Sequence, residues 1–215
     1  MSNQTQNHYD EQYWEYQSRI GRIGGMLNKF KFEKHILPTS CVLDFGCGGG
    51  YLLHELSCHT KVGFEVNPNA WKNAQSLGID TVASFDELQD DTFDVIISNH
   101  ALEHVPNPYD TLQQLHRVLK VGGLLVLVLP CEQSTDIEFN FNPNDINQHL
   151  FSWCPQSLGN LVKLSGFKVE MCSTIRHKWT PDYETAYSAP NYHDQCRQYA
   201  IEKGNYQIKC IGRKL

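Results

Sequence analysis

Three glycines and one carboxylate, each two residues from the next, form the pattern in this chain that most clearly indicates chemistry. Asp44, Gly46, Gly48 and Gly50 follow one another at this spacing after an apolar run. Glycine lets the backbone turn sharply with positive φ, and it lets a ligand approach the peptide groups without a Cβ in the way. A carboxylate before the first glycine would repel a pyrophosphate, but it can face an ammonium group. The pattern therefore predicts a nucleotide-type loop for a ligand with a cationic end.

A second carboxylate, Glu65, ends the next strand-like run, Lys61–Val66. It lies about 20 residues beyond the glycine loop, where nucleotide-binding folds place an acid against ribose hydroxyls. A dinucleotide fingerprint, G-x-G-x-x-G, has its third glycine one residue later than this chain does. The spacing therefore favours a nucleoside without a pyrophosphate. The alternative for Glu65 is a surface acid at the end of a strand.

Four parts of the chain resemble the class I S-adenosylmethionine-dependent methyltransferases. They are the glycine loop, Glu65, the stretch Phe93–Val105 with its A-L-E-H-V sequence, and Leu119–Gly123, where Val121 stands in place of the proline usual in relatives. The resemblance covers about residues 41–170. It implies a small-molecule methyltransferase that uses S-adenosylmethionine. The implied fold is Rossmann-like, with a seven-stranded, mostly parallel sheet and an antiparallel closing strand.

The resemblance also implies which residues contact the cofactor. The glycine loop would hold its methionine end, Ser84 and Phe85 would enclose the adenine, and the loop that starts at Asn99 would lie at the methyl end. Cys47, inside the glycine loop, could act as a nucleophile, but the family requires only a small residue there. The predicted cofactor-binding residues are Asp44, Gly46, Cys47, Gly48, Gly50, Glu65, Val66, Ser84, Phe85 and Asn99.

Two histidines are candidates for catalysis. O-methylation gains from a general base near the acceptor, and imidazole suits that role at neutral pH. His104 belongs to the A-L-E-H-V stretch, and His149 precedes the helix that closes the site in relatives. The alternative for both is a structural role, in which the ring packs or closes a loop.

The same region also matches a metal-site signature. His100, Glu103 and His104 fit H-x-x-E-H, in which two histidines on a helix hold zinc. The sequence Val105-Pro106-Asn107-Pro108 follows directly and breaks any long helix there. We therefore expect no metal site.

Composition limits the other function classes. A chain of 215 residues with 40% hydrophobic and 20% charged residues fits one α/β domain. The net charge of −6 argues against nucleic acid as a partner, which needs a basic face. The longest apolar run, Leu124–Leu129, is far shorter than the roughly 20 residues that span a membrane. The N-terminus is polar, and the eight cysteines form no C-x-x-C pair. We therefore expect a cytoplasmic protein with reduced cysteines and no membrane partner.

Strand and helix patterns alternate along the chain and predict a doubly wound α/β sheet. In such a sheet ligands bind at the carboxyl ends of the strands, where Asp44, Glu65 and Asn99 all fall. Gly122 and Gly123 are expected to end a helix over 110–119. The expected strands are Cys41–Phe45, Lys61–Val66, Thr81–Ala83, Phe93–Ser98, Leu124–Leu129, Phe167–Ile175 and Tyr206–Ile211, the last two a hairpin-like pair around 176–205.

The chain divides into two predicted parts. Residues 1–37 are an aromatic lead-in that ends in an amphipathic, helix-like stretch, Met26–Leu37. We expect this part to be a lid over the cofactor, as in related methyltransferases; simple packing against the domain is the alternative. Residues 38–215 form the methyltransferase domain. Within it, residues 131–152 are a long polar insertion that is expected to face the substrate.

The predicted activity is transfer of a methyl group from S-adenosylmethionine to an oxygen, or a nitrogen, of a polar small molecule such as a sugar or a hydroxylated metabolite. One alternative is an oxidoreductase on the same fold that uses NAD or a nucleotide sugar. Another is a non-catalytic module that keeps the cofactor pocket.

Overall fold

The computed structural model describes residues 11–131 and 148–215, and the side chains from Ser18 onward. Most of the predicted substrate-facing insertion, residues 132–147, lies outside the described residues, as do residues 1–10 of the lead-in.

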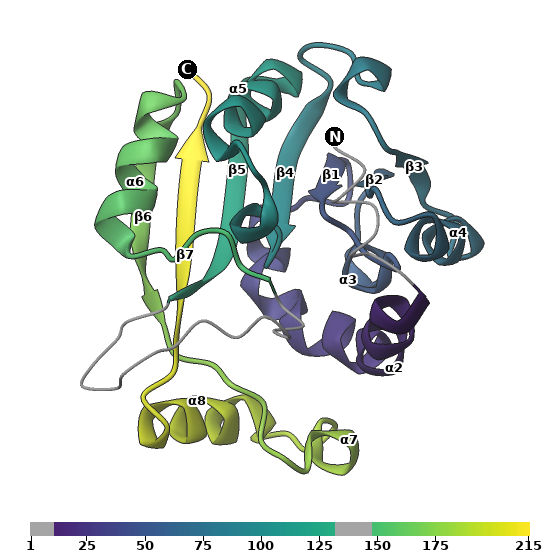
Figure 1. The fold of residues 1–215 in the computed structure, drawn as a ribbon, viewed down its shortest axis with the longest axis vertical. Helices are drawn as coiled ribbons and strands as arrows, with labels where there is room; N and C mark the ends of the chain where they lie inside the picture. The colour runs from purple at the N-terminus through teal and green to yellow at the C-terminus, as the bar shows by residue number, and fades with distance from the viewer. Residues whose placement is uncertain (1–10, 132–147) are drawn as a thin grey trace.

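Seven strands form one sheet in the order β3-β2-β1-β4-β5-β7-β6 (Figure 1). Strands β1 to β5 pair in parallel, and β7 runs antiparallel to both β5 and β6. This confirms the predicted seven-stranded, mostly parallel sheet with an antiparallel closing strand. The strands are β1 (Cys41–Phe45), β2 (Thr60–Phe64), β3 (Asp80–Val82), β4 (Phe93–Asn99), β5 (Leu119–Cys131), β6 (Lys168–Ile175) and β7 (Tyr206–Arg213).

Helices cover both faces of the sheet and the carboxyl ends of its parallel strands (Figure 1). They are α2 (Glu11–Asn28), α3 (Tyr51–Glu55), α4 (Pro68–Ser76), α5 (Pro108–Val118), α6 (Pro155–Leu164), α7 (Tyr183–Ala186) and α8 (Tyr192–Glu202). Short 3₁₀ turns are η1 (Lys29–Lys31), η2 (Glu33–His35), η3 (Phe85–Glu87) and η4 (Leu102–His104).

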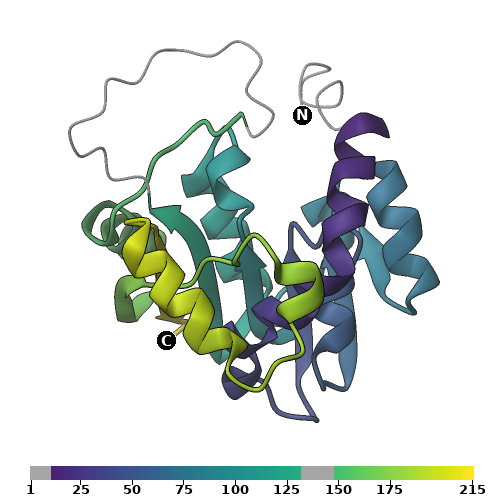
Figure 2. The same ribbon diagram turned by 90° about the horizontal axis from the view of Figure 1, so that it is seen from below.

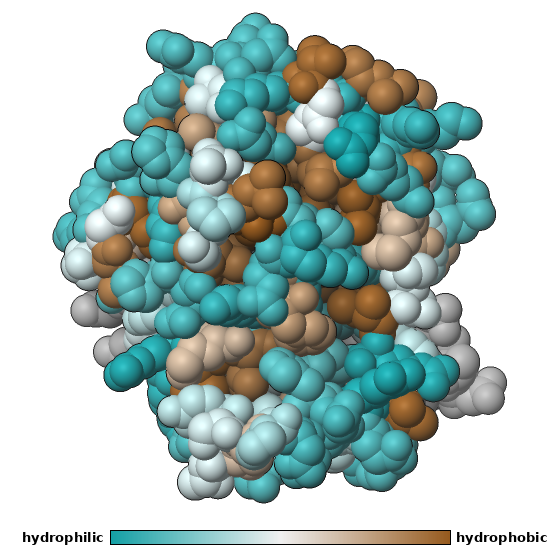
Figure 3. Space-filling model, turned by 180° about the vertical axis from the view of Figure 1, so that it is seen from behind, coloured by the Kyte–Doolittle hydropathy of each residue, from teal (hydrophilic) through white to brown (hydrophobic). Residues whose placement is uncertain are grey.

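Strand β5 shows why the sheet must be covered twice. Its Leu125, Leu127 and Leu129 join the core cluster beneath α5 and α6, whereas Val126 and Val128 join the cluster beneath α3 and α4. All five side chains are fully buried. A parallel sheet with apolar residues on both faces is stable only between two layers of helices. On the outer surface seen from behind, hydrophobic side chains form separate groups between hydrophilic ones (Figure 3).

The predicted amphipathic helix at Met26–Leu37 is wrong. Helix α2 instead begins at Glu11, passes through Gly24 and Gly25 and ends at Asn28, and the 3₁₀ turns η1 and η2 follow. The glycines do not break the helix, and they let it pack closely on its neighbours: Gly24 lies against Trp179, and Gly25 lies against α3. A Cβ on Gly25 would lie 2.5 Å from the carbonyl oxygen of Tyr51.

The expectation that Gly122 and Gly123 end a helix is also wrong. Helix α5 ends at Val118, and β5 begins at Leu119 and includes both glycines. The pairing of β4 with β5 shifts register here, from Phe93 opposite Leu119 to Val95 opposite Leu124. The N–H of Gly122 donates to the carbonyl oxygen of Lys214, 2.8 Å away, so the glycines form an irregular start to the strand.

A cap made of two distant parts of the chain covers the carboxyl ends of the parallel strands. Strands β6 and β7 pair antiparallel, as the sequence predicts, and the segment 176–205 between them folds into α7 and α8. Leu27 of α2 packs there against Tyr192 and Cys196 of α8. Figures 1 and 2 show α7 and α8 beyond the end of the sheet, next to α2.

Two further expectations concern cysteines and membranes. All eight cysteines lie within the described residues, and all are free thiols there. Among residues 11–131 and 148–215, no helix is both long and apolar enough to cross a bilayer.

Gly25 offers a test of the contact between α2 and α3. We expect Gly25→Ala to lower the free energy of unfolding by about 1–3 kcal/mol, because the new methyl group overlaps the backbone of α3. The matched control is Gly159→Ala in α6, where a Cβ would lie 3.6 Å from Cys172, an ordinary contact. That variant should be neutral or slightly stabilising in urea unfolding, because alanine favours a helix. Equal stability of the two variants would contradict the close packing.

Candidate functional site

A cavity of about 1090 Å³ lies at the carboxyl ends of β1, β2 and β4, beneath the cap. Ligand pockets in proteins usually hold about 300–1,000 Å³, so this one has room for a cofactor and a second small molecule. The sheet contributes one wall, and α2 with the segment 176–205 contributes the other.

The glycine loop turns directly beneath this cavity. Gly46 and Gly48 have φ of 75° and 53°, in the left-handed region that favours glycine. The N–H groups of Gly46 and Cys47 donate to the carbonyl oxygen of Phe64 (2.9 and 3.1 Å), which ties the loop to the end of β2. Gly50 is not among the cavity-lining residues; it is the N-cap of α3. Its predicted role is therefore indirect, through the start of that helix.

Glu65 holds the loops at the ends of β1 and β2 together. Its Oε2 accepts a hydrogen bond from the N–H of Gly48, and its Oε1 accepts from Val66 and Asn67, each at 2.8 Å. A carboxylate has about four acceptor positions, so one remains for a ligand hydroxyl. Burial raises the pKa of Glu65, and the three backbone N–H groups oppose that shift.

Asp44 lines the cavity with only 2% of its surface exposed. Burial, and then the nearby charge of Glu65, raise the pKa of Asp44 to about 8. Its carboxyl group is therefore largely protonated at neutral pH in the free protein. A ligand ammonium group would favour the ionised form, because an opposite charge nearby lowers the pKa of an acid.

Cys47 behaves as a small buried residue. Burial, with the charges of Asp44 and Glu65, raises the pKa of its thiol well above the ordinary value. A thiol that stays protonated is a poor nucleophile. Its side chain fills the space above Gly63, where a Cβ would come within 2.5 Å of the sulfur. This geometry supports the packing role expected for Cys47.

Phe45, Phe64 and Phe85 form an aromatic wall of the cavity, which also contains the acidic pair Asp44 and Glu65. The ring of Phe85 lies 4.6 Å from that of Phe64 and stacks on Phe45 at 5.9 Å. All three rings line the cavity together with Val66. Ser84, predicted to enclose the adenine, does not line it; its hydroxyl caps η3 by accepting from Asp86 N–H.

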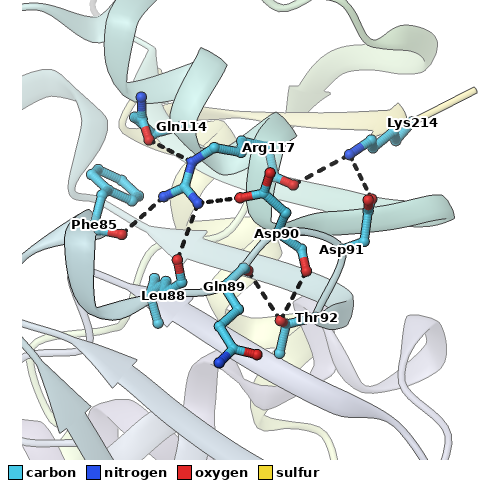
Figure 4. Close-up of polar contacts among 9 residues, drawn as sticks. All are labelled: Phe85, Leu88, Gln89, Asp90, Asp91, Thr92, Gln114, Arg117 and Lys214. Carbon is cyan, nitrogen blue, oxygen red and sulfur yellow. Dashed lines mark hydrogen bonds and ion pairs between the residues drawn. The ribbon is translucent and has the colours of Figure 1, made fainter.

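Arg117 holds this wall in place from α5. Its guanidinium donates to the carbonyl oxygens of Phe85 (2.9 Å) and Leu88 (3.0 Å), and it forms an ion pair with Asp90 (Figure 4). Lys214 extends the network through Asp91. The role of Arg117 in positioning Phe85 could not be predicted from local sequence patterns, because 32 residues separate the two.

Asn99 is the last residue of β4 and His100 follows it, and both line the cavity. The Oδ1 atom of Asn99 is buried and makes no hydrogen bond with any described residue. His100 has φ of 56°, and its N–H donates to Val128 in β5 at 2.8 Å. Burial, and then the charge of Lys31, lower the pKa of His100 to about 3, so its ring is neutral.

The structure brings the two predicted catalytic histidines together. The rings of His104 and His149 meet edge to face at 4.9 Å. Leu150 N–H donates to the carbonyl oxygen of Glu103 at 2.9 Å, which places His149 beside η4. His104 lines the cavity. His149 does not line it, and its ring packs on that of His104.

Glu103 sits between the histidines with no exposed surface. Its Oε1 lies 3.6 Å from His100 Nδ1 and 3.9 Å from His104 Nε2. The H-x-x-E-H stretch forms a 3₁₀ turn and no α-helix, as expected. Among the described residues, one ligand atom each of Glu103, His104 and His149 lie within 4.8 Å of one another, a set that could hold a metal ion. The absence of a metal stays a prediction.

The sequence missed the residues that the cap contributes. Asn28 and Lys31 carry no signal in the sequence. The others lie within 176–207, where the abundance of aromatic and histidine residues could have indicated them, and they include His177, Lys178, Trp179, Tyr183, Tyr199, Asn205, Tyr206 and Gln207.

A family model described as a methyltransferase domain matches residues 12–171, well over half of the chain. The chain belongs to this methyltransferase family. Its fold and glycine loop are those of the class I S-adenosylmethionine-dependent members.

The three similar proteins described next are 15–29% identical to this chain. The ubiquinone biosynthesis O-methyltransferase of Hahella chejuensis is 29% identical over 127 residues, which are 52% of this chain and 53% of the relative. The methyltransferase in a complex with the Trm112 activator of Haloferax volcanii has a TM-score of 0.71 at 17% identity and covers 97% of this chain and 96% of its own.

A third similar protein is Haemonchus contortus phosphoethanolamine N-methyltransferase 2 in complex with S-adenosyl-L-methionine. It has a TM-score of 0.63 at 15% identity, over 87% of this chain and 51% of that chain. The methyltransferase spans about half the length of the curated relatives that it matches.

Arg117 gives a prediction for the aromatic wall. Arg117→Ala should weaken binding of S-adenosylhomocysteine and cost about 1–3 kcal/mol of stability, because the carbonyl groups of Phe85 and Leu88 lose a charged donor. Asp90→Asn is the control: it removes an exposed ion pair and should change stability by less than about 1 kcal/mol. Calorimetric binding measured below the unfolding temperature separates the two effects. Unchanged affinity in folded Arg117→Ala would contradict the positioning role.

Proposed function

We propose that this protein transfers a methyl group from S-adenosylmethionine to an oxygen or nitrogen atom of a polar small molecule. The observation that carries the proposal is the arrangement of three features around one cavity. The carboxyl group of Asp44 can pair with an ammonium group, and Glu65 can accept a hydrogen bond from a ribose hydroxyl. The aromatic wall around Phe85 can pack against a flat base. These are the three recognisable parts of that cofactor.

The residues present fit this cofactor. Asp44 and the turn of Gly46–Gly48, which lines the cavity, would hold the methionine end, and Phe45, Phe64 and Phe85 would pack on the adenine. The buried Oδ1 of Asn99 would accept a hydrogen bond near the methyl end. When bound, the cofactor supplies an electrophilic methyl group on a sulfonium. The protein's task is then to hold the acceptor in line and to exclude water.

His104 is the proposed general base, and the ring of His149 contacts the ring of His104 edge to face. The acceptor oxygen would form its new bond to the methyl carbon while the carbon–sulfur bond breaks and leaves its electron pair on sulfur. The proton of the acceptor would pass to the imidazole of His104. Glu103, buried 3.9 Å away, stabilises the imidazolium that forms.

Membership of the methyltransferase family speaks against the oxidoreductase alternative. The relatives leave the acceptor open, because this chain matches only about half of their length and they include an O-methyltransferase and a cyclopropane-fatty-acyl-phospholipid synthase. The net charge of −6 speaks against a nucleic-acid acceptor, which needs a basic face. A protein that binds the cofactor and methylates nothing would instead be a non-catalytic module.

The pKa of Asp44 gives a direct test of cofactor binding. S-adenosylhomocysteine should bind more tightly as the pH rises from about 5.5 to 7, by up to about tenfold per unit, because Asp44 must lose a proton to face the ammonium group. Calorimetry in buffers of different ionisation enthalpy should show that proton leaving. Asp44→Asn should bind weakly and without this pH dependence.

Asp94→Asn is the matched control, because Asp94 accepts from Cys41 N–H at the other end of the sheet and does not line the cavity. It should keep the pH dependence of the unmodified protein. Binding of S-adenosylhomocysteine that is independent of pH in the unmodified protein would contradict the role of Asp44. No binding at all would overturn the proposed function.

His104→Gln tests the base. With an acceptor found by screening hydroxylated small molecules, turnover should fall by about 10²–10⁴, while the affinity for S-adenosylhomocysteine stays the same. The activity of the unmodified protein should survive EDTA, because the proposed base needs no metal. Activity lost to EDTA and restored by a divalent cation would show instead that Glu103, His104 and His149 hold a metal.

A further inference from the structure

The cavity has charges of opposite sign at its two ends. Among the described residues that line it, the acidic side chains are Asp44, near the end of β1, and Glu65, directly after β2. At the other end, next to β7 and the cap, the lining includes Lys31 and Lys178. The acidic end matches the cationic part of the cofactor. The basic end has no counterpart in that cofactor, which suggests a second, anionic molecule.

Lys31 is the central group of this basic end. It belongs to η1, lines the cavity and is only 3% exposed. Its Nζ donates to Gln207 Oε1 at 2.7 Å. An ammonium group has three donors, and this is the one hydrogen bond of Lys31 Nζ to the part of the chain that the structure describes. Burying a charge without an opposite charge is costly.

The surroundings of Lys31 make this charge unfavourable in the free protein. Burial, and then the charge of Lys209, lower the pKa of Lys31 to about 7. Lys209 is itself buried, and its Nζ donates to the carbonyl oxygen of Lys31. No carboxylate of the described residues contributes to the pKa of either lysine. Two neighbouring ammonium groups therefore lack a negative partner.

The same contacts fix Lys31 in place. Gln207 accepts from Lys31 through Oε1 and donates through Nε2 to the carbonyl oxygen of His177 at 2.8 Å. Both hydrogen bonds orient the amide group, so it presents an acceptor to the ammonium. Lys209 fixes the backbone of Lys31 by donating a hydrogen bond to its carbonyl oxygen. The lysine is therefore preorganised, which reduces the entropic cost of ligand binding.

His177 adds a neutral polar group beside Lys31. It is 5% exposed and lines the cavity, and its Nε2 lies 3.0 Å from His193 Nδ1. Its Nδ1 is buried and has no hydrogen-bond partner among the described residues. Burial, and then the charge of Lys31, lower the pKa of His177 to about 3. A neutral ring can donate one hydrogen bond to an oxyanion in the suitable tautomer.

We propose that the methyl acceptor carries an oxyanion, a carboxylate or a phosphate, and that Lys31 binds it with Gln207 and His177 at the basic end of the cavity. This inference rests on the proposed function, since it concerns the acceptor of that reaction. The acceptor's oxyanion would lie at the basic end, while its reacting atom lies near Asn99 and His104. Lys31 thereby becomes a determinant of substrate specificity.

The first test uses inorganic phosphate and acetate as probes, titrated by calorimetry into the protein loaded with S-adenosylhomocysteine. Lys31→Met should weaken the binding of whichever anion binds by about ten- to a hundredfold, because a charge-assisted hydrogen bond is lost. Lys29→Met is the matched control, since Lys29 is exposed in the same turn and pairs with Glu33. It should bind the anion as the unmodified protein does.

Gln207→Glu provides a second variant that does not remove the lysine. The new carboxylate lies against Lys31 and competes with an external anion, so anion binding should also be lost. Retained affinity for S-adenosylhomocysteine shows that each variant is folded. Absence of phosphate and acetate binding, or equal anion binding by Lys31→Met and the unmodified protein, would overturn the proposal.

Methylation assays with matched acceptors separate this inference from the proposed function. Hydroxy acids are compared with their carboxamides, and sugar phosphates with the free sugars, so that the two arms distinguish carboxylate from phosphate. The anionic member should have at least about tenfold higher kcat/KM, and Lys31→Met should remove that difference. Equal methylation of neutral and anionic members would overturn the anion site and leave the methyltransferase function standing. Anion binding that depends on Lys31, with no acceptor methylated, would support the site and count against the function.

Discussion

Two carboxylates at the ends of neighbouring strands are the constraint on which the site depends. Parallel pairing of β1 with β2 brings Asp44 opposite Gly63, so that Glu65 follows closely in the same buried region. Burial and like charge raise the pKa of Asp44, and burial raises that of Glu65. Three backbone N–H groups of the flanking loops compensate Glu65. Among the described residues, no backbone N–H group donates to the carboxyl group of Asp44. A cationic ligand could stabilise its ionised form instead.

The rest of the fold keeps this pair in position and encloses it. Two apolar layers hold the sheet, and Arg117 fastens the loop that presents Phe85. The cap closes the opposite side with α2 and the segment 176–205, which pack on each other through Leu27 and Tyr192. The cavity thus has one wall built from strand ends and another built from the two parts of the chain that lie outside the alternating βα order.

The sequence predicted the parts that depend on local pattern. An apolar run located β1 with the bounds that the structure shows. The sequence did not predict the helix through Gly24 and Gly25, because packing between distant segments decides its course. Gly25 lies against the backbone of α3, and Gly24 lies against the ring of Trp179. In the site, eight of the ten predicted cofactor residues line the cavity, whereas Gly50 and Ser84 cap helical turns. Lys31 could not be predicted, because a lysine in a short turn resembles any solvated one until the fold buries it.

The division of the cavity also explains why relatives say little about the acceptor. The family model ends at residue 171, before the segment 176–205 and β7 begin. The acidic pair and the aromatic wall fall inside the matched region, so the cofactor end follows from the family. His177 and Gln207 fall outside it, and they orient the one lysine at the basic end that lies inside. In the proposed site, selection of the acceptor would therefore depend on contacts between Lys31 and residues that lie beyond the region matched by the family model.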